Sequence, residues 1–221
     1  AHQKNIMTIE DPVEIELPNV SQVPVNHKIG VTFSKGLRAL LRHDPNIILV
    51  GEIRDDETAK VAVRASLTGL LVFSTIHANS APGAVTTLYN FHIPPFLLAT
   101  SLVGVIAQRL VRTICPACKA VHEPDEALLR QGGFVNDGED KKDDGKKTRT
   151  MKSASKTVFY KGAGCDACYG TGYSGRVGIF EILDITEDMR HAITERAPEA
   201  ELRRMAIEGG MSTLVERGRA L

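Results

Sequence analysis

Short apolar segments alternate with stretches of helical periodicity through the first half of the chain. Residues 5–9 (NIMTI), 47–50 (IILV) and 70–75 (LLVFST) are brief and apolar, and charged, glycine or polar residues close each of them. Such runs are typical of buried strands. Helical spacing of leucines predicts a helix over about 33–43, and a second is expected over about 56–68. Strands that alternate with helices predict an α/β domain with a mostly parallel sheet.

The two expected helices carry end signals. Thr32 is a candidate N-cap of the first helix, and Pro45 enforces its end. Asp55 and Asp56 lie at the positive end of the second helix dipole, and Gly69 is placed as its C-terminal stop.

The second half of the chain has a different character. The run FLLATSLVGVIA (96–107) is interpreted as a buried helix, too short to span a membrane. Residues 136–156 are rich in Lys, Asp and Gly, and predict a mobile loop because they bury too little apolar area to offset their ordering entropy. VGIFEIL (177–183) predicts a strand, and two or three short helices follow it.

The composition is that of a globular protein of 221 residues, 43% hydrophobic and 24% charged. Lys+Arg and Asp+Glu both number 27, so net charge does not favour a nucleic-acid or membrane-surface partner. We expect three parts, at 1–112, 113–176 and 177–221. The start AHQKNIMTIE lacks a secretory signal pattern, which favours a cytoplasmic location, and its opening without Met resembles a piece of something longer.

Glu52 is the most specific candidate for chemistry, at the end of the buried run in ILVGEIRD (48–55). Ligands of parallel α/β sheets collect at the carboxyl ends of strands, where a carboxylate can orient or deprotonate an attacking water. The alternative is a strand-end Glu that caps a neighbouring helix.

Polar groups follow two other expected strands as well. Glu10, Asp11 and Glu14 come after the first strand, and His77 and Asn79 come after the third. The edge-of-sheet argument predicts one crevice, with acceptors for a hydrated Mg²⁺ and a donor for a terminal phosphate.

Long motifs in a fixed order resemble the ATPases of type II secretion and type IV pilus assembly (GspE and PilB type). The motifs are TIEDPVE, GLRALLRHDP, ILVGEIRD, TGLLVFSTIHAN, AQRLVRTICPAC and CDACYGTGYSGRVGIFEIL. The resemblance implies a RecA-like ATPase core in 1–112, with TIEDPVE as the Asp box, ILVGEIRD as Walker B and STIHAN as the His box. It also implies a hexamer and inner-membrane platform partners, which would hold the protein at the membrane.

The resemblance also implies residue roles. Glu52 would be the catalytic glutamate, and His77 would contact the terminal phosphate. Glu10, Asp11 and Glu14 would serve the metal and the attacking water, with Glu10 and Glu14 counted among the catalytic residues. Arg54 and Asn79 would add nucleotide or Mg²⁺ contacts. Arg38 and Arg42, four residues apart on one expected helix face, would reach a neighbouring subunit's nucleotide. A solvated basic face is the alternative for these two arginines.

The phosphate-binding loop GxxxxGK[ST] does not occur in these 221 residues. GYSGRVG (172–178) lacks the Lys-Ser/Thr ending. We therefore expect the parent protein to hydrolyse ATP, and we expect this segment alone to hydrolyse little of it. A non-catalytic, zinc-bearing interaction module is the alternative function, and a DNA-handling ATPase is disfavoured by the neutral charge.

All four cysteines form two CxxC pairs, Cys115/Cys118 and Cys165/Cys168. Paired knuckles predict one tetrahedral Zn²⁺ with a closed, structural coordination shell in the 113–176 module. A redox CxxC, or four unrelated buried thiols, are the alternatives.

Overall fold

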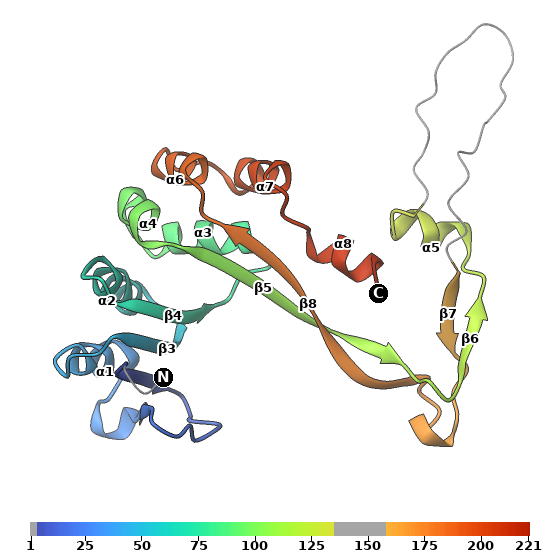
Figure 1. Cartoon of the computed structure of the whole chain (residues 1–221), viewed down its shortest axis with the longest axis horizontal. Coiled ribbons are helices and arrows are strands. Elements are labelled where there is room, and N and C mark those ends of the chain that lie inside the picture. Colours follow the sequence, from blue (N-terminus) through green and yellow to red (C-terminus); the bar gives the residue numbers. More distant parts are fainter. Residues whose placement is uncertain (1–3, 135–157) are drawn as a thin grey trace, which may run out of the picture. The chain divides into compact units, whose positions relative to one another are not determined.

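The computed structural model describes residues 4–134 and 158–221 (Figure 1). The chain divides into two compact units. The first unit combines the described residues up to Gln108 with Phe180–Leu214. The second combines the described residues of Arg109–Ile179 with Val215–Leu221. Residues 180–214 thus group with the N-terminal part, whereas the sequence led us to expect a separate part at 177–221. The expected loop 136–156 lies outside the described residues.

A four-stranded parallel sheet organises the first unit (Figure 1). Its strands are β1 (Ile6–Glu10), β2 (Ser21–Pro24), β3 (Ile47–Ile53) and β4 (Leu71–Ile76), in the order β2-β1-β3-β4. All three neighbouring pairs are parallel. The predicted α/β class with a parallel sheet is confirmed, and β2 is a strand that the hydrophobic pattern did not reveal.

Two capped helices pack on this sheet. Thr32 caps α1 (Phe33–Leu40) through the Lys35 amide, and Asp55 caps α2 (Asp56–Leu67) through the Thr58 amide at 2.7 Å. α1 ends three residues before the expected position, since the Asn5 side-chain amide binds the backbone carbonyls of residues 43 and 44 in the turn that follows. Arg42 therefore lies in the turn after α1, whereas the sequence predicted it within the helix that carries Arg38.

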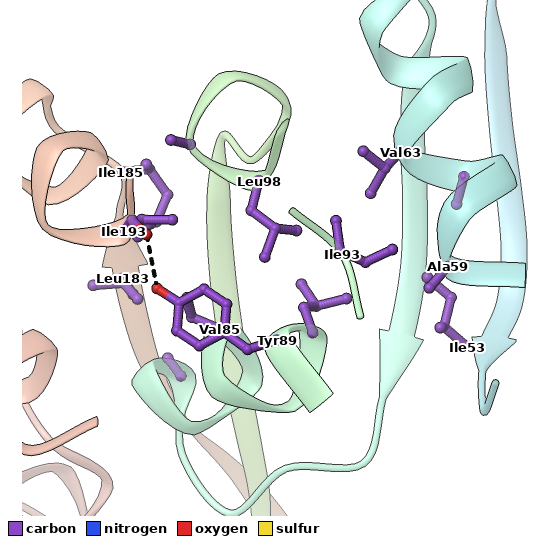
Figure 2. Packing of buried hydrophobic residues seen from close by; sticks show 14 of the residues in the cluster. Ile53, Ala59, Val63, Val85, Tyr89, Ile93, Leu98, Leu183, Ile185 and Ile193 are labelled. Carbon is purple, nitrogen blue, oxygen red and sulfur yellow. Dashed lines mark hydrogen bonds between the residues drawn. The ribbon is translucent and has the colours of Figure 1, made fainter. Parts of the chain in front are cut away.

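The C-terminal segment completes the core of the first unit. The further helices are α3 (Ala81–Asn90), α4 (Pro95–Ser101), α6 (Glu187–Thr194) and α7 (Glu199–Glu208), together with the short 3-10 turn His27–Ile29. Figure 2 shows Leu183 and Ile193 beside Leu98 and Tyr89. The Tyr89 hydroxyl donates to the Ile193 carbonyl at 3.2 Å. Segments about a hundred residues apart in sequence thus share one core.

The prediction of one buried helix over 96–107 is wrong. α4 ends at Ser101, and β5 (Gly104–Ile114) begins three residues later and pairs with β8 (Tyr173–Asp184). A short apolar run has no unique period, and here Gly104 disfavours a helix while the following β-branched residues favour a strand. β8 itself confirms the strand predicted at 177–183 and is longer than predicted.

The second unit contains a two-stranded antiparallel sheet of β6 (Lys119–His122) and β7 (Phe159–Gly162). It also contains α5 (Glu126–Gln131), the 3-10 turn Asp166–Cys168 and most of α8 (Leu214–Arg219). In neither unit does a described helix have the length and apolar character needed to cross a membrane.

Candidate functional site

Three neighbouring strands of the first unit end at the same edge of the sheet, and each brings a polar group there. Glu10 is the last residue of β1, Glu52 is the penultimate residue of β3, and His77 directly follows β4. Because these strands are parallel and adjacent, their carboxyl ends share one edge. The fold therefore places these three groups at the edge where α/β proteins bind ligands.

Glu52 is at the centre of this edge. Its side chain is 15% exposed, and its Oε2 atom lies 2.5 Å from Arg54 Nε and 3.5 Å from His77 Nε2. After a register shift between β3 and β4, Ile53 pairs with Ile76. Glu52 directly precedes Ile53 and His77 directly follows Ile76, so this pairing brings the two side chains close together. α2, the helix that follows, is capped by Asp55 and not by Glu52. Glu52 thus accepts a hydrogen bond from Arg54, lies close to the His77 imidazole, and is largely shielded from solvent.

Glu10 is held by side chains that the sequence did not single out. Its Oε1 atom accepts hydrogen bonds from the Thr8 hydroxyl and from Gln22 Nε2, the latter at 2.9 Å. Gln22 belongs to β2 and also contacts the backbone at Leu17 and Ile15. These bonds fix the carboxylate at the end of β1, and no local sequence signal predicts a partner twelve residues away.

The other acidic and polar candidates of the two boxes are exposed. Asp11 Oδ2 lies 3.9 Å from His27 Nε2, and Glu14 and Asn79 are also at the surface. In the described parts of the chain, the carboxylates of the Asp box do not converge into a group of three metal ligands. Mg²⁺ commonly uses one or two carboxylates together with substrate phosphates and water, so this arrangement is compatible with a shared metal site.

The two candidate inter-subunit arginines differ in their surroundings. Arg38 Nη2 lies 3.3 Å from Glu57 Oε1, an exposed ion pair between α1 and α2. Arg42 is exposed in the turn after α1. Exposed pairs contribute at most about 1 kcal/mol to stability, so the pair with Glu57 can be exchanged for another partner at little cost.

The four cysteines converge in the second unit. The ligand atoms of Cys115, Cys118, Cys165 and Cys168 all lie within 4.8 Å of one another. Three of the sulfur–sulfur distances are 4.0, 3.9 and 3.8 Å. A tetrahedron with Zn–S bonds of about 2.3 Å has edges of about 3.8 Å. The cluster therefore fits a tetrahedral zinc ion, as the spacing predicted.

The backbone around the cysteines is shaped to hold this cluster. Cys168 Sγ accepts amide hydrogen bonds from Cys165 at 3.3 Å and from Gly172 at 3.2 Å. Desolvation opposes ionisation, but these amides lower the pKa of the Cys168 thiol to about 6. Desolvation raises the pKa of the Cys118 thiol to about 11. The amide hydrogen bonds thus favour the Cys168 thiolate, which is the form that binds zinc.

Gly162 and Gly172 join the two cysteine turns. A Cβ on Gly172 would lie 2.6 Å from the Gly162 carbonyl oxygen, and Gly172 has a φ of +76°. The Gly172 carbonyl accepts a bond from the Cys115 amide at 3.0 Å. The glycine that follows the second cysteine pair is therefore also a contact of the first pair.

Comparison with known proteins decides the family. The family model described as "Type II/IV secretion system protein" matches residues 1–221. The chain belongs to this family. It is 45% identical over 215 residues to the type IV pilus assembly ATPase PilB of Thermus thermophilus, and 48% identical over 203 residues to the type II secretion system protein E of Dickeya dadantii. These alignments cover 97% and 92% of this chain, but 22% and 37% of the relatives, so the chain spans well under half of their length.

Solved structures agree with this assignment. The pilus retraction motor PilT with bound ADP aligns over 99% of this chain and 52% of its own, with a TM-score of 0.60 and 25% identity. The ATPase DotB of Legionella pneumophila has the same TM-score over 98% of this chain and 47% of its own, and its 18% identity supports the fold alone. The predicted RecA-like architecture is therefore confirmed for this member of the secretion family.

Proposed function

We propose that this secretion-family chain carries the water-activating and zinc-binding parts of an ATPase that drives type II protein secretion or type IV pilus assembly. Family membership and relatives named as pilus assembly and secretion proteins support a motor ATPase. The reaction would be phosphoryl transfer from ATP to water, in a ring that we expect to be a hexamer.

The observation that carries this proposal is the arrangement around Glu52. A partly shielded carboxylate lies 3.5 Å from the exposed His77 imidazole, with Glu10 at the end of the neighbouring strand. In this proposal Glu52 accepts the proton of the attacking water or orients it, and His77 donates to the terminal phosphate. Arg54 holds the Glu52 carboxylate in place, and Asn79 contributes a further phosphate contact.

The metal and phosphate contacts would be shared with other parts of the protein. Mg²⁺ bound with ATP would neutralise developing charge on the phosphates. Glu10 is fixed by two donors and would bind the metal's water shell, with Asp11 and Glu14 nearby in sequence. No GxxxxGK[ST] loop occurs in the 221 residues, so we propose that these residues alone bind ATP weakly and turn over little.

The exposed arginines and the zinc module would serve assembly. Arg38 and Arg42 are proposed to contact the nucleotide of a neighbouring subunit, with Arg38 leaving its exposed pair with Glu57. The zinc ion would be structural, because four thiolates close its coordination shell. We propose that platform proteins of the inner membrane bind the assembled ring on its cytoplasmic side, and equal numbers of acidic and basic residues give no reason to add a nucleic-acid partner.

A second candidate function rests on the cysteine cluster. A zinc-stabilised unit that docks on partners would need no catalytic edge in the first unit. This alternative predicts that secretion or pilus assembly survives loss of the Glu52 carboxylate and fails on loss of zinc.

The test is Glu52→Gln in the whole protein. Removing the base should lower kcat for ATP hydrolysis by about 100- to 10,000-fold and leave the ATP Kd nearly unchanged. Glu208→Gln is a matched control, because this exposed carboxylate pairs locally with Arg204 on α7. Turnover by the Glu52→Gln protein at the control rate would remove Glu52 from the catalytic role.

A further inference from the structure

One carboxylate in the core of the first unit has no part in the chemistry described so far. Glu181 is 1% exposed and lies on β8 between the buried Ile179 and Leu183, at a position where strand alternation points inward. Among the residues that the structure describes, it forms no ion pair. Burying a carboxylate is costly unless hydrogen bonds compensate, so the bonds that it makes need a reason.

Glu181 instead binds helix amides. Its Oε1 atom accepts from the Ala81 amide at 2.8 Å, and its Oε2 atom accepts from the Leu214 amide at 3.2 Å. Ala81 is the first residue of α3, a ten-residue helix with no acidic residue in its first turn. Glu181 thus supplies, from a hundred residues away, the negative charge that the positive end of this helix lacks.

A second carboxylate holds the residue before Ala81. The Ser80 hydroxyl accepts from the Gly83 amide at 3.0 Å and donates to Glu199 Oε1 at 2.8 Å. Glu199 is the first residue of α7 and is also bonded by Arg203 at 3.2 Å. Two carboxylates of the C-terminal segment therefore converge on the start of α3.

The start of α3 lies two residues after the end of the His box. His77–Ser80 are the four residues between β4 and α3, and β4 fixes the first end of this segment through the pairing of Ile76 with Ile53. The His77 side chain is 86% exposed, so packing does little to orient it. The strand pairing of Ile76 lies on one side of it and the hydrogen-bonded start of α3 on the other.

We propose that Glu181 and Glu199 are positioning residues for ATP hydrolysis, which hold the His77–Ser80 segment so that the His77 imidazole stays beside Glu52. This inference rests on the proposed ATPase function for its kinetic consequence. It also means that the C-terminal part of the first unit, through β8 and α7, bears directly on the geometry of the candidate active site.

The kinetic test is a double-mutant cycle in the whole protein. Glu181→Gln keeps the shape of the side chain, but it replaces one carboxylate oxygen by an NH₂ group. This group cannot accept a hydrogen bond, so one of the two backbone amides that Glu181 binds loses its acceptor. Displacements of about 1 Å in an active site can cost about 100-fold in rate, so we expect kcat to fall by roughly 10- to 100-fold with little change in KM for ATP. If Glu181 acts through His77, the variant should cause little further loss in a His77→Ala background. Full additivity of the two losses would overturn the proposal.

Glu199→Ala serves as a second variant that keeps its fold, because the Glu199 side chain is 44% exposed. It should lower kcat several-fold, again without further loss in the His77→Ala background. Glu201→Ala, at an exposed position on the same helix, is the matched control and should retain the wild-type rate. A Glu199→Ala protein as active as this control would count against the positioning role.

Amide hydrogen exchange separates this inference from the proposed function. Faster exchange in residues 77–84 of the Glu181→Gln protein, by about tenfold or more, with none in the Glu201→Ala protein, would support the anchoring of the His box whether or not the protein hydrolyses ATP. Unchanged exchange there would overturn it. A wild-type protein without ATPase activity would instead overturn the proposed function.

Discussion

Replacing Cys118 by Ser should remove the zinc ion and unfold the two cysteine turns while leaving the first unit intact. The sulfur atoms of three cysteine pairs are already 3.8–4.0 Å apart, so zinc can bind without rearranging the chain. Among the described residues of the second unit, Cys115, Cys168 and Ile179 are the buried hydrophobic ones, so little apolar core remains without metal. Structural zinc contributes about 10–16 kcal/mol in small Cys-rich sites, which is as large as the whole stability of a typical domain.

Metal analysis and hydrogen exchange would measure this effect. The wild-type protein should hold about one zinc per chain with four sulfur ligands at about 2.3 Å by X-ray absorption, and Cys118→Ser should hold much less. Exchange should rise by about 100-fold or more in residues 115–122 and 159–172, and stay unchanged in β1 and β3. Ser174→Ala, an exposed position on β8, is the control. A metal-free protein with unchanged exchange in these segments would refute the zinc assignment.

Gly172, Tyr89 and Cys118 give further testable outcomes. Gly172→Ala should weaken zinc retention against a chelator by roughly 1–3 kcal/mol. Gly175 has a φ of +78° but open space around it, so Gly175→Ala should show the backbone cost alone. Equal effects of the two substitutions would mean that the contact of Gly172 with Gly162 is not the cause. Tyr89→Phe should cost about 1 kcal/mol in urea unfolding at pH 7. Burial raises the pKa of the Tyr89 hydroxyl above its usual value of 10. The free energy of unfolding of the wild type should therefore fall more steeply than that of Tyr89→Phe as pH rises beyond 10. Equal slopes for the two proteins would contradict this. The pKa of the Cys118 thiol is raised to about 11, so this thiol must lose its proton when zinc binds at pH 7. Zinc loading should therefore release protons and weaken on acidification. Calorimetry in buffers of different ionisation enthalpy measures this proton release, and its absence would contradict the prediction.

Local chemistry made much of the first unit predictable. Thr32 and Asp55 cap their helices because a side-chain oxygen before a helical run satisfies a free amide whatever the rest of the fold does. Glu52 and His77 follow apolar runs, and parallel strands necessarily bring such positions to one edge. These inferences needed no knowledge of distant residues.

Long-range pairing decided what the sequence could not show. Residues 96–107 read equally well as a helix or a strand until β8, some seventy residues later, pairs with β5. Gln22 beside Glu10 and Glu181 beside Ala81 likewise depend on how the chain returns to the sheet. In the sequence, Glu181 carries one weak signal of a buried role, which is a charge at an inward position of an apolar strand. The partner amides, at Ala81 and Leu214, carry no such signal.

The measurement that tests the central claim most directly is a structure of the whole protein with Mg²⁺ and a non-hydrolysable ATP analogue. We predict the terminal phosphate at the carboxyl edge of β1, β3 and β4, within about 3 Å of His77 Nε2, with a water between that phosphate and Glu52. A nucleotide bound with its phosphates away from this edge would contradict the account.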